Sequence, residues 1–177
     1  MYFFAMQVTT GHEKTFKAKL LYAMQANYCY PVHIPVQIKP ERRKGRLFKT
    51  ERVIFPGYVF LEYPDAALSY QLLTIIQRLP YFIRVLPQTA AALPLREKDA
   101  RLLSFLIQPK QKKISQAYFD ENDRIVVIDG LLKELQGFIV RVDKRKGRAK
   151  VKLEMCDNPF TIDIAFEDIK KVGVKES

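Results

Sequence analysis

The apolar residues of this 177-residue chain follow two different patterns, separated by a short polar segment at residues 109–117. Stretches with helical spacing alternate with β-prone stretches before this segment, whereas only short β-prone stretches and turns follow it. The segment reads Pro-Lys-Gln-Lys-Lys-Ile-Ser-Gln-Ala and offers almost nothing to a core, which is typical of a linker. We therefore expect two small domains, at residues 1–108 and 118–177.

The first domain is expected to mix helices and strands. β-prone stretches predict strands at residues 2–9, 55–63 and 81–86, with a short or edge strand at 29–38. Apolar residues at helical spacing predict helices at 13–24, 68–79 and 96–106. Elements intermixed in this order fit a compact α+β sandwich of the split-βαβ kind.

The second domain is expected to contain only strands and turns. Strands are predicted at residues 124–128, 138–142, 148–155 and 160–164, with turns at Asp129-Gly130 and at the basic residues 143–147. Short strands in so small a domain favour a barrel, because closing the sheet leaves no unpaired edges.

The charge of the chain is strongly basic and unevenly distributed. Lysine and arginine number 30 against 19 aspartates and glutamates, a net charge of +11. The excess is +8 in residues 1–108 and +3 in the linker, while residues 118–177 carry twelve charges of each sign. Such an excess favours a polyanionic partner through counterion release.

Nothing in the sequence indicates catalysis, a cofactor or a metal. His12 and His33 lie in unrelated contexts, and no nucleophile, phosphate-loop or metal-ligand motif occurs. Cys29 and Cys156 form no disulfide or zinc pattern, which predicts a protein of the reducing cytoplasm. The N-terminus has no basic leader and no apolar run is long enough to span a membrane, so we expect neither secretion nor membrane insertion.

A predicted hairpin in the second domain carries seven cations: Arg141, Lys144, Arg145, Lys146, Arg148, Lys150 and Lys152. Alternation along its strands sends five apolar residues inward, namely Val140, Val142, Ala149, Val151 and Leu153. Like charges on one strand face repel, so a bound phosphate would stabilise this stripe. A solvated edge strand that lysines protect against aggregation is the alternative.

A second group of cations precedes Phe55 in a glycine-containing segment that we expect to be a loop: Lys39, Arg42, Arg43, Lys44, Arg46, Lys49 and Arg52. Such a loop could follow a nucleic-acid backbone without reading bases. The candidate contacts to DNA are Arg42, Arg43, Lys44 and Arg46. A merely solvated loop is the alternative.

The stretch Phe55-Pro56-Gly57-Tyr58-Val59-Phe60 predicts a turn followed by a strand that is apolar on both faces. Tyr58 and Phe60 share one face of this strand, while Val59 and Leu61 share the other. A strand of this kind either lies between two layers or presents one face to a partner. The pattern leaves core burial and partner contact both open.

Motifs in both halves of the chain, taken in order, resemble the NusG family of transcription elongation factors. In the first half they are Gln7, Gly11 and Glu13 after an aromatic strand, residues 55–62, Phe82-Ile83 before Val85, and Pro94-Leu95. In the second half they are Asp123 with Ile125 and Val127, Asp129-Gly130, Gly137 within residues 135–140, residues 146–152 and residues 162–166. The resemblance implies an NGN domain followed by a KOW domain with an SH3-like barrel.

The resemblance also implies partners. The NGN domain would grip the clamp helices of the RNA polymerase large subunit through Tyr58 and Phe60, close to upstream DNA. Further candidates for this contact are Ser69, Tyr70 and Leu72. The KOW domain would hold nascent RNA through the seven cations of its hairpin, and we expect a monomeric, non-enzymatic factor.

Two departures from the general factor of this family favour a specialised paralog. Leu131-Leu132 stand where that factor usually has Pro-Phe, and residues 154–158 replace its Phe-Gly loop, which meets ribosomal protein S10 or Rho. The cation-rich hairpin is similar to that of the LoaP group, antiterminators whose KOW domain binds a leader-RNA hairpin. The alternatives are a general factor that couples polymerase to Rho or the ribosome, and a ribosome-associated KOW protein that binds RNA.

Overall fold

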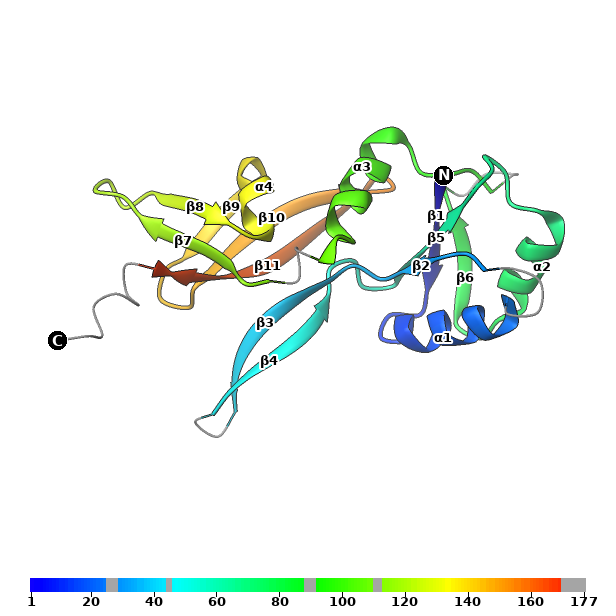
Figure 1. Ribbon diagram of the computed structural model, residues 1–177, viewed down its shortest axis with the longest axis horizontal. Coiled ribbons are helices and arrows are strands. Elements are labelled where there is room, and N and C mark those ends of the chain that lie inside the picture. Colours follow the sequence, from blue (N-terminus) through cyan, green and yellow to red (C-terminus); the bar gives the residue numbers. More distant parts are fainter. Residues whose placement is uncertain (25–28, 44–45, 88–91, 110–112, 170–177) are drawn as a thin grey trace. The chain divides into compact units, whose positions relative to one another are not determined.

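The computed structural model of the protein (Figure 1) describes residues 1–24, 29–43, 46–87, 92–109 and 113–169. Its chain divides into two compact units. Unit 1 contains residues 1–35 and 55–107, and unit 2 contains residues 36–54 and 108–177. Unit 2 therefore includes residues 36–54, which the sequence pattern assigns to the first domain.

Unit 1 is built on a four-stranded sheet with the order β2-β5-β1-β6. The strands are β1 (Tyr2–Val8), β2 (Val32–His33), β5 (Tyr58–Tyr63) and β6 (Phe82–Leu86), and neighbouring strands are antiparallel. Three helices accompany the sheet: α1 (Glu13–Met24), α2 (Tyr70–Arg78) and α3 (Glu97–Leu106). This arrangement confirms the predicted α+β fold of the split-βαβ kind.

One face of this sheet forms the hydrophobic core together with α1 and α2. Val59 and Leu61 of β5 belong to one buried cluster with Phe16 of α1 and Leu72 of α2. The apolar spacing of these helices predicts their inward faces, because residues three and four apart lie on one side of a helix. Burial of these side chains stabilises the unit by removing apolar surface from water.

The turn before β5 is fixed by Gly57, whose φ of +83° is in the left-handed region. A Cβ at this position would lie 2.9 Å from Thr10 Oγ1 and 3.3 Å from the Val8 carbonyl oxygen. The Gly57 N–H donates to Glu13 Oε1 at 2.6 Å, and the same oxygen accepts from the Gly11 N–H at 3.1 Å. The Glu13 carboxylate therefore connects the turn before β5 to the turn between β1 and α1.

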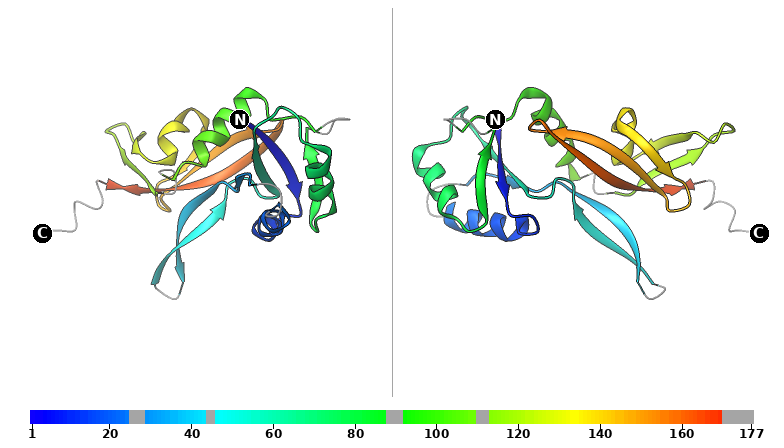
Figure 2. Two further views of the ribbon diagram at one scale, coloured as in Figure 1. Left: turned by 45° about the vertical axis from the view of Figure 1, so that its right-hand side comes forward. Right: turned by 180° about the vertical axis from the view of Figure 1, so that it is seen from behind.

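Residues 36–53 form a β-hairpin and not the predicted loop. Strands β3 (Val36–Arg43) and β4 (Arg46–Val53) pair from Val36 opposite Val53 to Arg43 opposite Arg46, in a long twisted ribbon (Figure 2). Pro40 fits because the strands of a two-stranded ribbon each have an open edge where no N–H is needed. The hairpin groups with unit 2, where β3 lies against β11 (Asn158–Asp168). The sequence did not predict the strands of the hairpin, because the many cations of the segment leave no clear alternation of apolar and polar residues.

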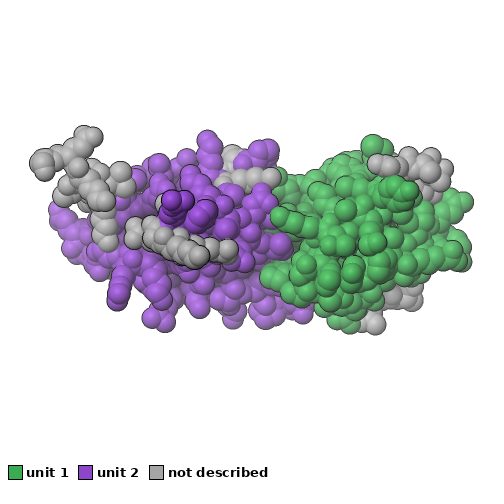
Figure 3. Space-filling model, turned by 90° about the horizontal axis from the view of Figure 1, so that it is seen from below, with its two compact units in different colours: residues 1–35, 55–107 green, residues 36–54, 108–177 purple. Residues whose placement is uncertain are grey.

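Unit 2, coloured purple in Figure 3, contains a five-stranded sheet with the order β8-β7-β11-β10-β9. Besides β11, its strands are β7 (Ser115–Phe119), β8 (Ile125–Asp129), β9 (Ile139–Asp143) and β10 (Arg148–Met155), and a short helix α4 (Leu131–Glu134) follows β8. Buried and exposed residues alternate along β10. The strands confirm the predicted small domain of the β-barrel kind, whereas α4 was not predicted, because only strands and turns were expected there.

Strand β7 begins inside the segment that the sequence pattern assigns to the linker. Ser115 is 1% exposed, and its hydroxyl oxygen accepts a hydrogen bond from the Leu132 N–H at 2.9 Å. β7 then runs parallel to β11, with Ser115 opposite Phe166. The sequence pattern did not predict this strand because its residues are mostly polar. Pairing with distant segments, and not its own composition, stabilises it.

No helix in the described part of the chain is long and apolar enough to cross a membrane.

Candidate functional sites

In unit 1, aromatic residues lie on the side of the sheet that faces away from α1 and α2. Phe3 and Ala5 of β1 share this side with Tyr58 and Phe60 of β5, because Ala5 lies directly opposite Phe60. The Phe60 ring lies 6.0 Å from the Phe55 ring and 6.4 Å from the Tyr58 ring, measured between centroids. We call Phe3, Ala5, Tyr58 and Phe60 the aromatic face.

Two polar pairs lie at the margins of the aromatic face. Arg84 Nε of β6 donates to Gln7 Oε1 of β1 at 2.7 Å. His33 Nε2 of β2 lies 3.0 Å from Glu62 Oε2 of β5. An apolar centre with a polar rim is the composition of protein–protein interfaces. The sequence did not predict this rim, because the rim depends on which strands pair. Only Glu62 could be placed from the sequence, since it lies on the same side of its strand as Tyr58 and Phe60.

The aromatic face is covered in the unbound chain. Tyr58 is 6% exposed and Phe60 is 0% exposed. Their rings are therefore not presented to solvent, and a partner can reach them only after a rearrangement.

The other predicted polymerase-contact residues do not join the aromatic face. Leu72 is fully buried among residues of the opposite sheet face, so it is a core residue and not a surface contact. Ser69 caps α2, its Oγ accepting from the Leu72 N–H at 3.2 Å. Tyr70 is 84% exposed at the start of α2. Their closeness in sequence does not place them beside β5, because α2 covers the other side of the sheet.

Unit 2 gathers charged side chains around a polar hollow of about 200 Å³, which we call the cationic hollow. Its lining residues are Arg141, Asp143, Lys146, Arg148, Lys150 and Asp163. Arg141 lies opposite Lys150, which in turn lies opposite Asp163 on β11. Four cations and two carboxylates leave the hollow positive. The carboxylates reduce the repulsion expected along the stripe, and sequence reasoning missed Asp163 because only strand register reveals it.

Three cations of the hairpin do not line the hollow: Lys144 and Arg145 lie in the turn between β9 and β10, and Lys152 lies on β10. Lys144 forms an ion pair with Asp123, and its Nζ lies 4.3 Å from the centroid of the Phe119 ring. This cation therefore connects two turns of unit 2 as well as adding to the basic surface. Arg145 is exposed at the tip of the turn.

Asp143 anchors the same turn from the end of β9. Its Oδ1 accepts a hydrogen bond from the Lys146 backbone N–H at 3.0 Å, and Lys146 Nζ lies 3.6 Å from its Oδ2. The backbone hydrogen bond, followed by the positive charges of Lys146 and Arg141, lowers the pKa of Asp143 below its ordinary value. A charged Asp143 therefore favours the turn that presents the cations.

A β-bulge changes the predicted orientation of Val140. Arg141 pairs with Lys150 and Ile139 with Val151, which leaves Val140 as the extra residue of β9. Its side chain is 59% exposed, so the prediction that it points inward is wrong. Phe138, just before β9, is 52% exposed.

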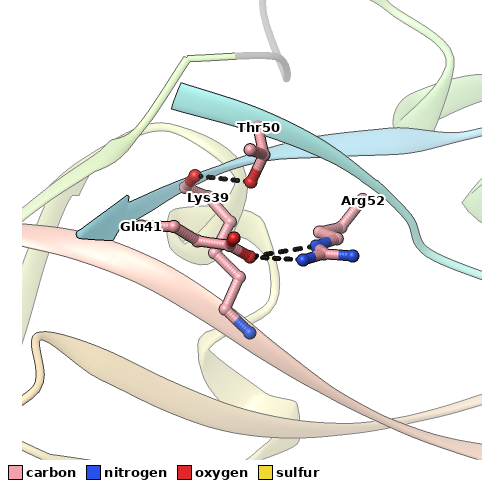
Figure 4. Close-up of polar contacts among 4 residues, drawn as sticks. All are labelled: Lys39, Glu41, Thr50 and Arg52. Carbon is pink, nitrogen blue, oxygen red and sulfur yellow. Dashed lines mark hydrogen bonds and ion pairs between the residues drawn. The ribbon is translucent and has the colours of Figure 1, made fainter. Parts of the chain in front are cut away.

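The cations of the β3–β4 hairpin are only partly described. Arg52 donates two hydrogen bonds to the same oxygen, Glu41 Oε1, from Nη2 at 2.5 Å and from Nε at 3.1 Å (Figure 4). Glu41 therefore balances one of the predicted cations. Arg46 is exposed. Lys44 and the side chains of Arg42 and Arg43 lie outside the described residues.

Comparisons with known proteins show which family this chain resembles. The family model described as transcription termination factor nusG matches residues 1–104. The transcription termination/antitermination protein NusG of Haemophilus influenzae is 28% identical over 141 residues, covering 80% of this chain and 76% of that protein. The protein of the same description from Pasteurella multocida is 26% identical over 142 residues, covering 80% of this chain and 77% of that protein.

A solved structure of Thermotoga maritima NusG, described as showing domain interaction, is similar in fold. Its TM-score is 0.56 and its sequence identity 14%, with 93% of each chain covered. At this identity the likeness concerns the fold alone.

Proposed function

Because the chain belongs to the NusG family, we propose that it is a specialised transcription elongation and antitermination factor. In this proposal unit 1 binds RNA polymerase and unit 2 binds nascent RNA. The observation that carries it is the cationic hollow, where four cations gather although residues 118–177 carry equal numbers of basic and acidic side chains. Charge concentrated on one face of a neutral domain favours phosphate contact there.

RNA binding at the cationic hollow predicts an affinity that falls steeply with salt. Replacing both Arg141 and Lys150 by glutamine should weaken binding of the full chain to a leader-RNA hairpin. The slope of log affinity against log salt should become shallower by about 0.7 to 0.9 for each phosphate that no longer meets a cation. Fluorescence anisotropy over a salt series measures both quantities.

Lys133→Gln is the matched control, because Lys133 is an exposed cation of unit 2 on α4, outside the hollow. This variant should bind RNA as the unaltered chain does. If the double variant also keeps its affinity and its slope, RNA is not held at the cationic hollow.

The polymerase half of the proposal rests on the aromatic face and its polar rim. We assign to this face the contact with the clamp helices of the polymerase large subunit. Since Tyr58 and Phe60 are 6% and 0% exposed, docking through them requires the unbound chain to rearrange first. The polar pairs Gln7–Arg84 and His33–Glu62 would then border the interface.

The β3–β4 hairpin has a lesser role in this proposal, following the backbone of upstream DNA. Arg46 is exposed near its tip, whereas Arg52 is already paired with Glu41. Contacts of this kind position a protein on DNA without reading its sequence.

A general factor that couples polymerase to Rho or the ribosome is the second candidate. The names of the relatives favour it, since both are termination/antitermination proteins. A pull-down from lysate with the full chain distinguishes the two. Recovery of Rho or small ribosomal subunits in amounts comparable to polymerase would favour the general factor, whereas polymerase without them favours the specialised one.

A further inference from the structure

An exposed aromatic ring lies beside the cation-bearing strand of unit 2. Phe138 is 52% exposed and borders a hollow of about 320 Å³, which we call the aromatic pocket. Its lining residues are Phe138, Lys152, Leu153, Glu154, Asp157 and Pro159. Stacking is the interaction that an exposed aromatic ring beside a hollow offers best.

The walls of the aromatic pocket are held by regular structure. Phe138 closes a 3₁₀ turn in which its N–H donates to the Leu135 carbonyl at 3.0 Å. On the other side, Glu154 of β10 lies opposite Pro159 of β11, and a two-residue turn joins these strands. Both residues of that turn, Cys156 and Asp157, have positive φ, as a tight hairpin turn requires. The pocket is therefore built before any ligand arrives.

The aromatic pocket continues the row of cations along β10. Lys150 lines the cationic hollow and Lys152 lines the aromatic pocket. These two residues lie on the same outward side of β10, about 6.6 Å apart along the strand. A nucleic-acid strand whose phosphates contact this row therefore has a base within reach of the Phe138 ring.

The charge inside the aromatic pocket selects a base over a phosphate. Lys152 is its one cation among the lining residues, against the two carboxylates of Glu154 and Asp157. A phosphate placed between these carboxylates would be repelled, whereas carboxylate oxygens accept hydrogen bonds from the N–H groups of a base. The apolar surfaces of Phe138 and Pro159 suit the flat face of the same base.

Building on the RNA binding proposed above, we propose that the aromatic pocket holds one unpaired nucleobase of the RNA. The base stacks on Phe138, its N–H edge faces Glu154 and Asp157, and the adjoining phosphate contacts Lys152. A base within a duplex cannot enter, because its faces are covered by its neighbours and its edge is paired. The pocket thereby selects RNA with a bulged or looped nucleotide, while the cationic hollow binds any RNA strand.

The test compares two RNA probes that share one stem, one fully paired and one with a single bulged nucleotide replaced by a fluorescent adenine analogue. With the full chain, Phe138→Ala should weaken binding of the bulged RNA about fivefold or more and leave the paired RNA unaffected. The quenching of the analogue on binding should also disappear. The salt slope should not change, because every cation that meets a phosphate is kept.

Two further variants make the result specific. Phe138→Tyr keeps the ring and should retain both affinity and quenching. Ile128→Ala removes an exposed apolar side chain, 40% exposed, from β8 at the opposite edge of the same sheet, and should bind as the unaltered chain does. Both side chains are about half exposed, so these substitutions should leave the fold intact.

The outcomes separate this inference from the proposed function. If Phe138→Ala binds both RNAs with unchanged affinity and quenching while the Arg141 and Lys150 variant loses affinity, the pocket is not a base site and RNA binding by the hollow stands. A Phe138→Ala variant that loses only a protein partner would likewise overturn the base site. If the unaltered chain binds neither RNA, the proposed function and the base pocket both fall.

Discussion

At position 57 only glycine meets both the backbone and the packing requirements of the turn. Gly57→Ala places a Cβ 2.9 Å from Thr10 Oγ1 in a residue with φ of +83°. Strain of this kind costs about 1–3 kcal/mol, so the free energy of unfolding and the melting temperature of the full chain should both fall. Thermal unfolding followed by circular dichroism measures the change.

Gly137→Ala is the control for this substitution, because a Cβ there meets nothing within 4 Å. It should leave the melting temperature close to that of the unaltered chain. Equal melting temperatures for the two variants would show that the turn tolerates a side chain at position 57.

The titration of Asp143 provides a second prediction at the level of single residues. Its pKa is lowered in the folded chain, so it contributes stability that is present above its unfolded pKa of about 3.9 and is lost as the pH falls through the folded value. An NMR titration should therefore find the Asp143 carboxyl titrating below the ordinary aspartate range.

The largest cause of this lowered pKa is a backbone N–H and not a side chain. Lys146→Ala keeps that N–H and should keep most of the depression, whereas Lys146→Pro removes it and should raise the pKa of Asp143. A titration at the ordinary aspartate value in the unaltered chain would contradict the turn geometry.

At the level of elements, periodicity predicted most helices and strands and missed those that depend on pairing. The helix at Glu13–Met24 and strands β8, β9, β10 and β11 follow local patterns, so they were predictable. The β3–β4 ribbon and β7 were not predictable. Charged and polar side chains occur on both faces of these strands, so no alternation of apolar and polar residues indicates them, and the strands form by pairing with other segments of the chain. The bulge at Val140 shifts the pairing of β9 with β10 by one residue, and the alternation of apolar and polar residues in the sequence does not reveal this shift.

In the candidate sites, too, the features that follow from local pattern were predictable and those that depend on tertiary packing were not. That Tyr58 and Phe60 share one side of a strand follows from parity alone. That Leu72 belongs to the core and that Asp163 lies opposite Lys150 follow from tertiary packing and register, so the sequence could not indicate them. Phe138 has one signal in the sequence, an aromatic residue directly before a basic hairpin, but its exposure depends on the 3₁₀ turn.

At the level of the whole molecule, the proposed function assigns an apolar sheet face of unit 1 to polymerase and a charged surface of unit 2 to RNA. Unit 1 offers the aromatic face bordered by Gln7–Arg84 and His33–Glu62. Unit 2 offers cations of β9, β10 and their turn together with the aromatic pocket. An apolar interface gives affinity for a protein, and a cationic one gives fast, salt-dependent capture of RNA. The proposed function, which joins polymerase to its transcript, would use both.

Docking of polymerase on the aromatic face can be tested with two tyrosines of β5. Tyr58 and Tyr63 are 6% and 5% exposed, but they lie on opposite sides of the sheet. The measurement is the affinity of full-length Tyr58→Ala and Tyr63→Ala for purified RNA polymerase, at a temperature where circular dichroism shows both folded. Tyr58→Ala should bind at least about tenfold more weakly than the unaltered chain, whereas Tyr63→Ala should bind as the unaltered chain does. Equal affinities for the two variants would contradict docking through this face.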